Sequence, residues 1–296
     1  ERSYIEARKM MNQEGYSDQD ASWGSKILQK LIFNKVSSHI TVNQIYLNSI
    51  RTLHFTHKNI QNEKCILYFH GGGYVAGSPE THQNMLLSLA KLSSIQIFAI
   101  DYSLSPENIF PQAINDAVAS YNALLEKGFQ SQNIFIGGDS AGGNLTLVSS
   151  LQLQKLNIRL PSKIFLLSPW TDLTGHGRSI KENSKSDPYL SYDNWLNTSL
   201  SMQKTVKEWY APNQNYNNPL ISPVFAEYSN FPSTLIQVSD IEILYSDSID
   251  LASQIRNGDN KVKLSIYKNL PHVWQIFGFL PETKQAIREI SEFLLN

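Results

Sequence analysis

Gly138-Asp139-Ser140-Ala141-Gly142 places a serine in the pattern G-x-S-x-G. The pattern is typical of a sharp strand-to-helix turn that exposes a nucleophilic serine. Its context fits, because the apolar run Asn133–Ile136 precedes it and an apolar-periodic stretch, about Gly143–Leu156, follows it. A helix N-terminus also favours the negative charge that builds up during acyl transfer. We therefore predict that Ser140 is a nucleophile on a strand-to-helix turn, called the elbow below. The prediction depends more on the flanking strand and helix than on the three fixed residues of the G-x-S-x-G pattern.

A second motif, His70-Gly71-Gly72-Gly73, follows the apolar run Cys65–Phe69. Consecutive glycines let backbone N–H groups approach a ligand without obstruction. A flexible turn or a phosphate loop has a similar composition. No G-K-[ST] or G-x-G-x-x-G pattern is completed here, which argues against a phosphate loop.

His272 lies in the turn Leu270–Trp274, after the last apolar run of the chain. A lone histidine is more often structural than catalytic. This one follows both Ser140 and the acidic residues Asp240 and Glu242, which come at the end of another predicted strand. The order serine, acid, histidine is that of α/β-type serine hydrolases. We therefore predict that His272 is the general base.

The remaining candidates for metal or redox chemistry are few. His54 and His57 lie close in sequence, but two ligands do not make a metal site. Cys65 is the only cysteine, so the chain has no internal disulfide and no cysteine-based zinc site. A single cysteine fits a reducing compartment, and we predict a cytoplasmic location with no metal and no cofactor.

Composition excludes other classes of protein. The 296 residues include 25 Lys+Arg and 26 Asp+Glu, so no basic surface is available for nucleic acid. No apolar run is long enough to span a membrane, and the polar stretch from Glu1 lacks the pattern of a signal peptide. Whether a leader preceded Glu1 stays open. With 41% hydrophobic residues the chain has an ordinary globular composition.

The elements that must position these residues alternate along the chain. Short apolar runs alternate with amphipathic stretches, which predicts an α/β protein with a mostly parallel sheet and helices on both faces. The predicted strands are Cys65–Phe69, Ile95–Ile100, Asn133–Ile136, Lys163–Leu167, Thr234–Val238 and Lys261–Tyr267. The predicted helices are Pro111–Lys127, about Gly143–Leu156, about Leu244–Asn257 and Pro281–Leu295.

Two segments interrupt the alternation. Residues 1 to about 40 read as amphipathic helices, and residues 175–223 are rich in Asn, Ser and Tyr without strand-like runs. We interpret both as a cap on one domain that spans residues 1–296. The alternative is a disordered tail and a long surface loop, but long structureless loops are uncommon in compact domains.

Together these motifs resemble those of the hormone-sensitive-lipase-like group of α/β-hydrolase esterases. That group carries an H-G-G-G loop, a G-D-S-A-G-G elbow and a D-Y-R-L-A-P-E segment followed by F-P. Here they read His70–Gly73, Gly138–Gly143 and Asp101–Glu107, with Phe110-Pro111 after the third. The similarity extends from about Cys65 to the C-terminus, whereas residues 1 to about 50 match only by position. The resemblance implies an α/β-hydrolase fold with a helical cap and no cofactor.

The resemblance also implies roles for individual residues. Ser140 would be the nucleophile and His272 the general base. The backbone N–H groups of Gly72, Gly73 and Ala141 would form the oxyanion hole. His70 would shape the glycine loop, and Asp139 and Glu107 would be structural.

The sequence departs from the group's pattern at two places. Ser103 replaces the arginine of D-Y-R-L. By the resemblance this change would affect a supporting polar contact and would leave the catalytic groups untouched. Many relatives have D-P-L where this chain reads Ser239-Asp240-Ile241-Glu242-Ile243-Leu244. Alignment on the leucine gives Glu242 the position of the acid, with Asp240 as the alternative and Asp247 on the surface of the following helix.

The leading hypothesis is a serine carboxylesterase that hydrolyses small-molecule esters with short to medium acyl chains. Assembly of the chain into a homodimer is left open as part of this hypothesis. A non-catalytic receptor of the same fold would be expected to lack His272. Hydrolysis of amides is the third hypothesis. The substrate pocket is expected to be lined by Tyr74, Phe225 and aromatic residues between Tyr189 and Tyr210.

Overall fold

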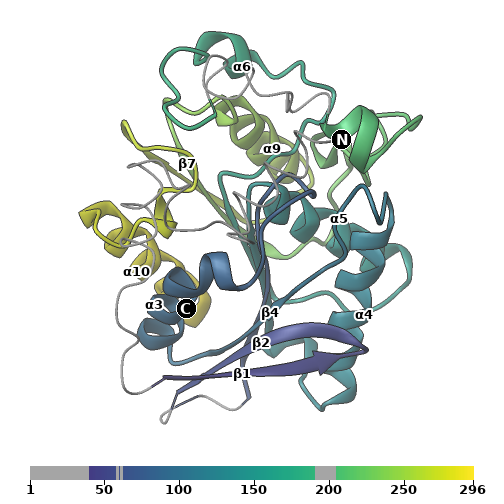
Figure 1. Cartoon of the computed structure of the whole chain (residues 1–296), viewed down its shortest axis with the longest axis vertical. Coiled ribbons are helices and arrows are strands. Elements are labelled where there is room, and N and C mark those ends of the chain that lie inside the picture. Colours follow the sequence, from purple (N-terminus) through teal and green to yellow (C-terminus); the bar gives the residue numbers. More distant parts are fainter. Residues whose placement is uncertain (1–39, 58–59, 61–62, 191–204) are drawn as a thin grey trace, which may run out of the picture.

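A single eight-stranded sheet organises the chain in the computed structural model, which describes residues 40–57, 60, 63–190 and 205–296 (Figure 1). The strands lie in the order β1-β2-β4-β3-β5-β6-β7-β8. Their bounds are Ile40–Leu47 (β1), Ile50–His57 (β2), Cys65–Phe69 (β3), Gln96–Ile100 (β4), Ile134–Asp139 (β5), Lys163–Leu167 (β6), Ser233–Ser239 (β7) and Val262–Tyr267 (β8). All pairs from β4 to β8 across the sheet are parallel, which confirms the prediction of a mostly parallel sheet.

The sequence analysis missed the β1–β2 hairpin. β1 pairs antiparallel with β2, and β2 pairs antiparallel with β4 at the edge of the parallel set. Asn48 and Ser49 both have positive φ, at 44° and 69°, as the favoured two-residue hairpin turns require. Most side chains of β1 remain at least partly exposed, so its apolar pattern is weak. The sequence pattern therefore did not predict the two strands of this hairpin.

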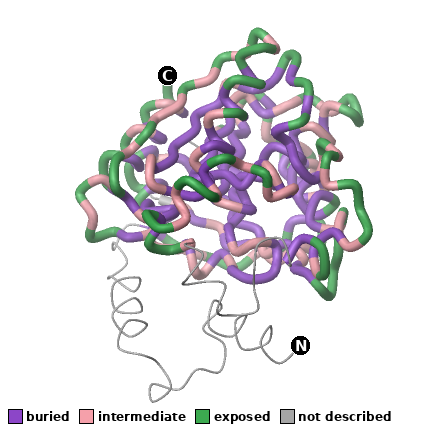
Figure 2. Tube along the Cα trace, turned by 90° about the horizontal axis from the view of Figure 1, so that it is seen from above, coloured by how far each residue is buried: buried purple, intermediate pink, exposed green. Residues whose placement is uncertain are grey.

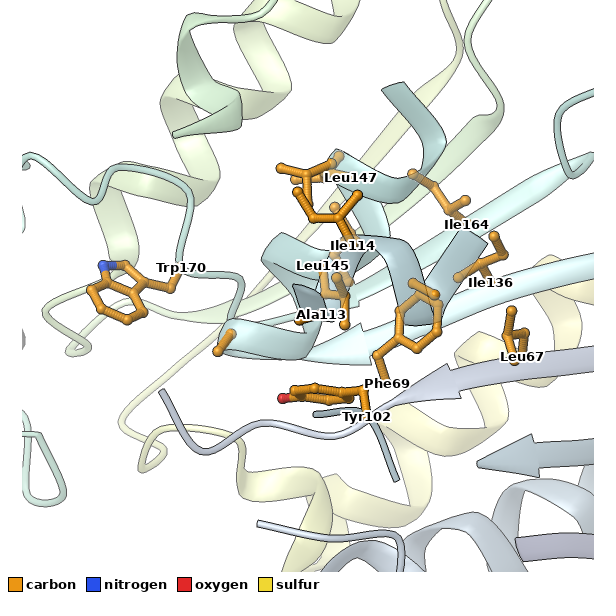
Figure 3. Packing of buried hydrophobic residues seen from close by; sticks show 14 of the residues in the cluster. Leu67, Phe69, Tyr102, Ala113, Ile114, Ile136, Leu145, Leu147, Ile164 and Trp170 are labelled. Carbon is orange, nitrogen blue, oxygen red and sulfur yellow. The ribbon is translucent and has the colours of Figure 1, made fainter. Parts of the chain in front are cut away.

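Helices cover both faces of the sheet. α3 packs against α10 on one face, and α4, α5 and α9 lie on the other (Figure 1). Each face has its own core cluster, and Figure 3 shows the larger one, in which Leu145 of α5 packs near Phe69 and Ile136 of the sheet. The bounds are Gln83–Ser93 (α3), Gln112–Glu126 (α4), Ala141–Lys155 (α5), Arg178–Glu182 (α6), Tyr245–Asn257 (α9) and Pro281–Leu295 (α10). Shorter helices are Glu80–His82 (η1), Ser131–Asn133 (η2), Thr205–Tyr210 (η3), Pro223–Phe225 (η4) and Trp274–Ile276 (η5).

Buried residues fill the interior of the trace and exposed residues follow its outer loops (Figure 2). In the described parts of the chain, no helix is both long enough and apolar enough to cross a bilayer. The cap prediction falls largely on residues 1–39 and 191–204, which lie outside the described residues. The described part of 175–223 holds α6 and η3 and no strand, in agreement with the sequence.

Candidate active site

The serine elbow lies between the central strand β5 and the buried helix α5. β5 ends at Asp139 and α5 begins at Ala141, so Ser140 is the single residue between them, with φ 52° and ψ −117°. Its N–H donates to Leu167 O at 2.9 Å, and its carbonyl accepts from Trp170 N at 3.0 Å. These bonds hold the strained residue against the end of β6. A Cβ at Gly142 would lie 2.0 Å from Phe69 O, which explains why this position needs glycine.

The glycine loop lies directly against this elbow. Gly72 and Gly73 have φ of 119° and 64°, in the region that favours glycine. The N–H of Gly71 donates to Asp139 Oδ1 at 3.0 Å. A Cβ at Gly71 would lie 2.2 Å from Asp139 Oδ2, so no side chain fits between loop and elbow.

His70 belongs to the internal structure of the loop. Its Nδ1 lies 2.7 Å from Gly71 O, and its ring stacks on that of Tyr102 with centroids 4.3 Å apart. Burial, together with the nearby charge of His82, lowers the pKa of His70 to about 4. His70 is therefore a neutral residue that shapes the loop, in line with the expectation from the resemblance.

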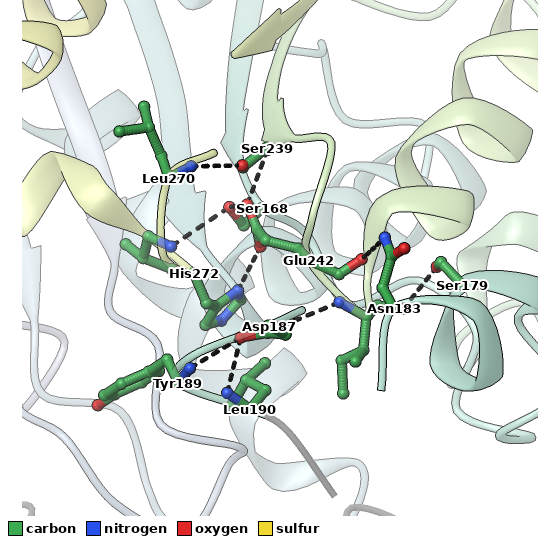
Figure 4. Close-up of polar contacts among 12 residues, drawn as sticks. Ser168, Ser179, Asn183, Asp187, Tyr189, Leu190, Ser239, Glu242, Leu270 and His272 are labelled. Carbon is green, nitrogen blue, oxygen red and sulfur yellow. Dashed lines mark hydrogen bonds and ion pairs between the residues drawn. The ribbon is translucent and has the colours of Figure 1, made fainter. Parts of the chain in front are cut away.

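His272 and Glu242 form a buried pair. His272 Nδ1 lies 2.6 Å from Glu242 Oε2, and the residues are 4% and 0% exposed (Figure 4). The other carboxylate oxygen accepts hydrogen bonds from Ser168 Oγ and from Ser239 N, both at 2.8 Å. Burial lowers the pKa of His272, but the hydrogen bond and charge of Glu242, with Asp187 and Asp139 adding to them, raise it above 6.5 overall.

The two other acids considered from the sequence lie elsewhere. Asp240 Oδ1 accepts from the backbone N–H of Asn269 at 2.9 Å, in the turn that leads to His272. Glu242, and not Asp240, therefore contacts the imidazole in this structure. The expectation that Asp247 lies on a helix surface is wrong, because it is 2% exposed and its Oδ2 accepts from the N–H groups of Thr171 and Asp172. The first turn of α9 faces the loop after β6 rather than solvent.

Two residues that the sequence analysis did not single out brace the turn of Glu242. Asn183 Nδ2 donates to the carbonyls of Asp240 and Glu242 at 2.9 and 2.8 Å. Asp187 Oδ2 accepts from Ile243 N at 3.0 Å, while its Oδ1 accepts from Tyr189 N and Leu190 N (Figure 4). The dipeptide Asp187-Pro188 is a turn signal, but its long-range partner is not visible in the sequence.

The pocket residues expected from the sequence separate into two sets. Tyr189 lies beside the site, with its ring centroid 6.3 Å from that of His272, and Phe225 is 46% exposed. Tyr74 is buried in the core instead: its ring stacks on Tyr210 at 3.9 Å, and its hydroxyl donates to Asn144 Oδ1 at 2.7 Å. The expectation of Tyr74 as an open pocket wall is therefore wrong, because its polar end is bound behind the elbow.

The described residues hold no cluster of three or more His, Cys, Asp or Glu side chains arranged to bind a metal. His54 contacts Gln96 Oε1 at 3.0 Å and stacks on Phe98. Cys65 is buried in β3.

Comparison with known proteins places this geometry in a family. The model of a family with the alpha/beta hydrolase fold matches residues 66–276, which include the glycine loop, the elbow and His272. The chain belongs to the α/β-hydrolase family. The family match confirms the predicted fold class.

Similar proteins show to which group of α/β hydrolases this chain belongs. An esterase of Acinetobacter venetianus is 35% identical over 229 residues, 77% of this chain and 73% of the relative. An acetyl-hydrolase of Streptomyces hygroscopicus is 30% identical over 235 residues, 79% of this chain and 76% of the relative. The crystal structure of an esterase from the bacterial hormone-sensitive lipase family is 30% identical, with a TM-score of 0.84, and the match covers 99% of this chain and 97% of the other.

These matches make the chain a hormone-sensitive-lipase-like α/β hydrolase, and so an enzyme of the serine esterase type. The hypothesis of a non-catalytic receptor is set aside.

Proposed function

We propose that the protein hydrolyses carboxylic esters with Ser140 as nucleophile, His272 as general base and Glu242 as the acid that orients the histidine. The buried contact of 2.6 Å between His272 Nδ1 and Glu242 Oε2 carries this proposal. A carboxylate at Nδ1 fixes the proton on that nitrogen, which leaves the lone pair of Nε2 free to accept the proton of a serine.

The reaction has two halves. Ser140 Oγ attacks the ester carbonyl while His272 Nε2 takes the serine proton, and the tetrahedral oxyanion forms. The oxyanion collapses, the alcohol leaves with the proton from His272, and the acyl group stays on Ser140. Water then attacks the acyl-enzyme by the same route, which releases the carboxylic acid and restores the serine.

The oxyanion hole is assigned to the N–H groups of Gly72, Gly73 and Ala141. Ala141 is the first residue of α5, where the helix N-terminus favours negative charge. The positive φ values of Gly72 and Gly73 support the assignment, because they turn the loop while adding no side chain to obstruct its N–H groups.

Short to medium acyl chains are the proposed substrates. The name of the Streptomyces relative, an acetyl-hydrolase, supports the short end of that range. Tyr189 beside His272 supplies an aromatic wall for an acyl or alcohol group. The cap built from residues 1–40 and 175–223, the cytoplasmic location and the homodimer stay predictions.

A panel of p-nitrophenyl esters of increasing acyl length tests the proposal. We expect turnover to be highest for the short members and to fall by several orders of magnitude in Ser140→Ala, because triad members act as a unit. Ser88→Ala is the matched control, since Ser88 lies exposed on α3 and its hydroxyl donates to Asn84 O within its own helix. Retention of most activity by folded Ser140→Ala would exclude Ser140 as the nucleophile.

A further inference from the structure

Asp139, the residue before Ser140, joins the serine elbow to the glycine loop. Its Oδ1 accepts from Gly71 N at 3.0 Å and from the Tyr68 hydroxyl at 2.6 Å. Its Oδ2 lies 3.1 Å from His82 Nε2. The carboxylate is 2% exposed, so it depends on these partners for its stabilisation.

Both ring nitrogens of His82 face hydrogen-bond acceptors. Nε2 faces the Asp139 carboxylate, and Nδ1 lies 2.8 Å from Thr81 Oγ1 and 3.3 Å from Ser78 O. A backbone carbonyl can only accept, so the contact with Ser78 O calls for a proton on Nδ1, and the Thr81 hydroxyl can then accept from Nδ1 while it donates to Ser78 O at 2.7 Å. A histidine that donates from both ring nitrogens carries two protons and a positive charge.

We propose that His82 is held as an imidazolium paired with Asp139, and that it is a positioning residue for the oxyanion loop, acting through the bond from Asp139 to Gly71 N. The inference rests on the proposed function, because the loop matters to catalysis only if Gly72 and Gly73 bind the oxyanion. The ion pair fixes the carboxylate, and the carboxylate fixes the loop relative to the residue that follows it, Ser140.

Charges around the pair favour this state. Burial lowers the pKa of His82, but the charge and hydrogen bond of Asp139 outweigh it and raise that pKa above 6.5. Burial likewise raises the pKa of Asp139, whereas His82 and the Tyr68 hydroxyl bring it below its usual value. Other groups near the pair include His70, neutral with its ring centroid 6.0 Å from that of His82, the neutral phenol of Tyr102, and Glu80, which is bound by Arg51. The charge of Asp139 also acts on the site, where it adds to the raised pKa values of His272 and Tyr189. His82 is therefore the cation that balances Asp139.

Loss of the charge leaves Asp139 buried beside a weaker donor. A buried charge without its partner is costly, so the carboxylate would shift toward other donors and carry Gly71 with it. Displacing oxyanion donors affects the transition state more than the bound substrate. The effect should therefore appear in kcat and hardly in KM.

The experiment compares His82→Gln with the wild-type enzyme on p-nitrophenyl acetate, with active sites titrated by an organophosphate. We expect kcat to fall by about 10- to 100-fold, with KM within about three-fold, because a small misplacement of catalytic groups costs that much. Asp139→Asn and the double variant should be about as slow as His82→Gln alone, since the two residues act as a unit. The control is His54→Gln, whose kcat should not change, because His54 is a half-buried histidine on β2 that contacts Gln96 of β4.

A second measurement reads the charge directly. In ¹⁵N-histidine spectra of the wild-type chain, with His82 assigned by comparison with His82→Gln, both ring nitrogens should be protonated at pH 7. Thr81→Val, which removes one acceptor of Nδ1, should lower kcat more at alkaline than at acidic pH. This milder variant tests positioning if His82→Gln does not fold.

Three results would overturn the inference: a neutral His82 at pH 7, a folded His82→Gln with kcat per active site within about two-fold of wild type, or additive losses in the double variant. If His82→Gln does not fold, a Thr81→Val enzyme with wild-type kcat at every pH overturns it as well. Activity of Ser140→Ala would instead remove the proposed function, while the measured charge of His82 would stand.

Discussion

Glu242 contacts His272 with one carboxylate oxygen, 2.6 Å from Nδ1, and commits the other to Ser168 Oγ and Ser239 N. The acid is thus held by the residue that follows β6 and by the last residue of β7. Asn183 and Asp187 brace the same turn through its backbone. The orientation of the imidazole is therefore set by four residues from three segments of the chain, at positions 168, 183–187 and 239, rather than by the acid alone.

The first prediction separates the two acids of the turn. Glu242→Gln should lower kcat by roughly 10³-fold or more, because an amide at Nδ1 no longer fixes the tautomer of His272. Asp240→Asn should retain most of its kcat, since an asparagine oxygen still accepts from Asn269 N. Both are measured by steady-state kinetics on proteins of equal thermal stability. The reverse order would give the role to Asp240.

The second prediction concerns Ser168. Ser168→Ala removes one of the two donors that the described residues supply to Glu242 Oε1, so kcat should fall by about 10-fold and the melting temperature should drop. Ser168 has φ 45°, so the control is Ser94→Ala, at φ 54° at the end of α3 and away from the site. Equal kinetics in the two variants would show that Ser239 N alone suffices to hold the acid.

The third prediction concerns pH. Burial alone would lower the pKa of His272, but Glu242 raises this pKa above 6.5. Because the base must be neutral to act, kcat/KM should rise with pH through a midpoint above 6.5. Glu242→Gln should shift the midpoint to lower pH. The raised pKa also stabilises the fold below about pH 6.5, and this contribution is lost as pH rises through the folded-state pKa. A midpoint below 6.5 in the wild-type profile would contradict the prediction.

The fourth prediction concerns Asp247. Burial raises the pKa of this carboxyl to about 8, so the folded state holds a proton that the unfolded chain releases above about pH 3.8. Its contribution to stability is present below pH 3.8 and is lost as the pH rises toward 8. Asp247→Asn cannot ionise, so its melting temperature should improve relative to wild type as the pH rises from 5 to 9. Asp250→Asn, on the exposed side of the same helix, should show no such trend.

Elements with a clear local apolar pattern could be predicted from the sequence. β3 and β6 were predicted to the residue, and α10 as well, because their apolar residues recur with a clear period and glycine or proline marks their ends. The half-exposed β1 has no such contrast. The hairpin was therefore missed.

The same limit applies to the site. Ser140 and His272 lie in recognisable motifs, and an alignment on Leu244 pointed to Glu242. Burial of His82 and Asp247 depends on partners 57 and 76 residues away, which no local pattern reveals. Asp187 and Ser168 were missed for the same reason.

The lack of space for a side chain at Gly71, beside Asp139 Oδ2, and at Gly142, beside Phe69 O, restricts how this enzyme can diversify. Neither glycine has room for even a methyl group, so we expect substitution at either one to yield inactive or unfolded chains rather than altered substrate ranges. We expect new specificity to arise instead from side chains beside the site, such as Tyr189, whose ring lies next to that of His272. Libraries for directed evolution should therefore leave the two glycines fixed and vary such neighbouring side chains.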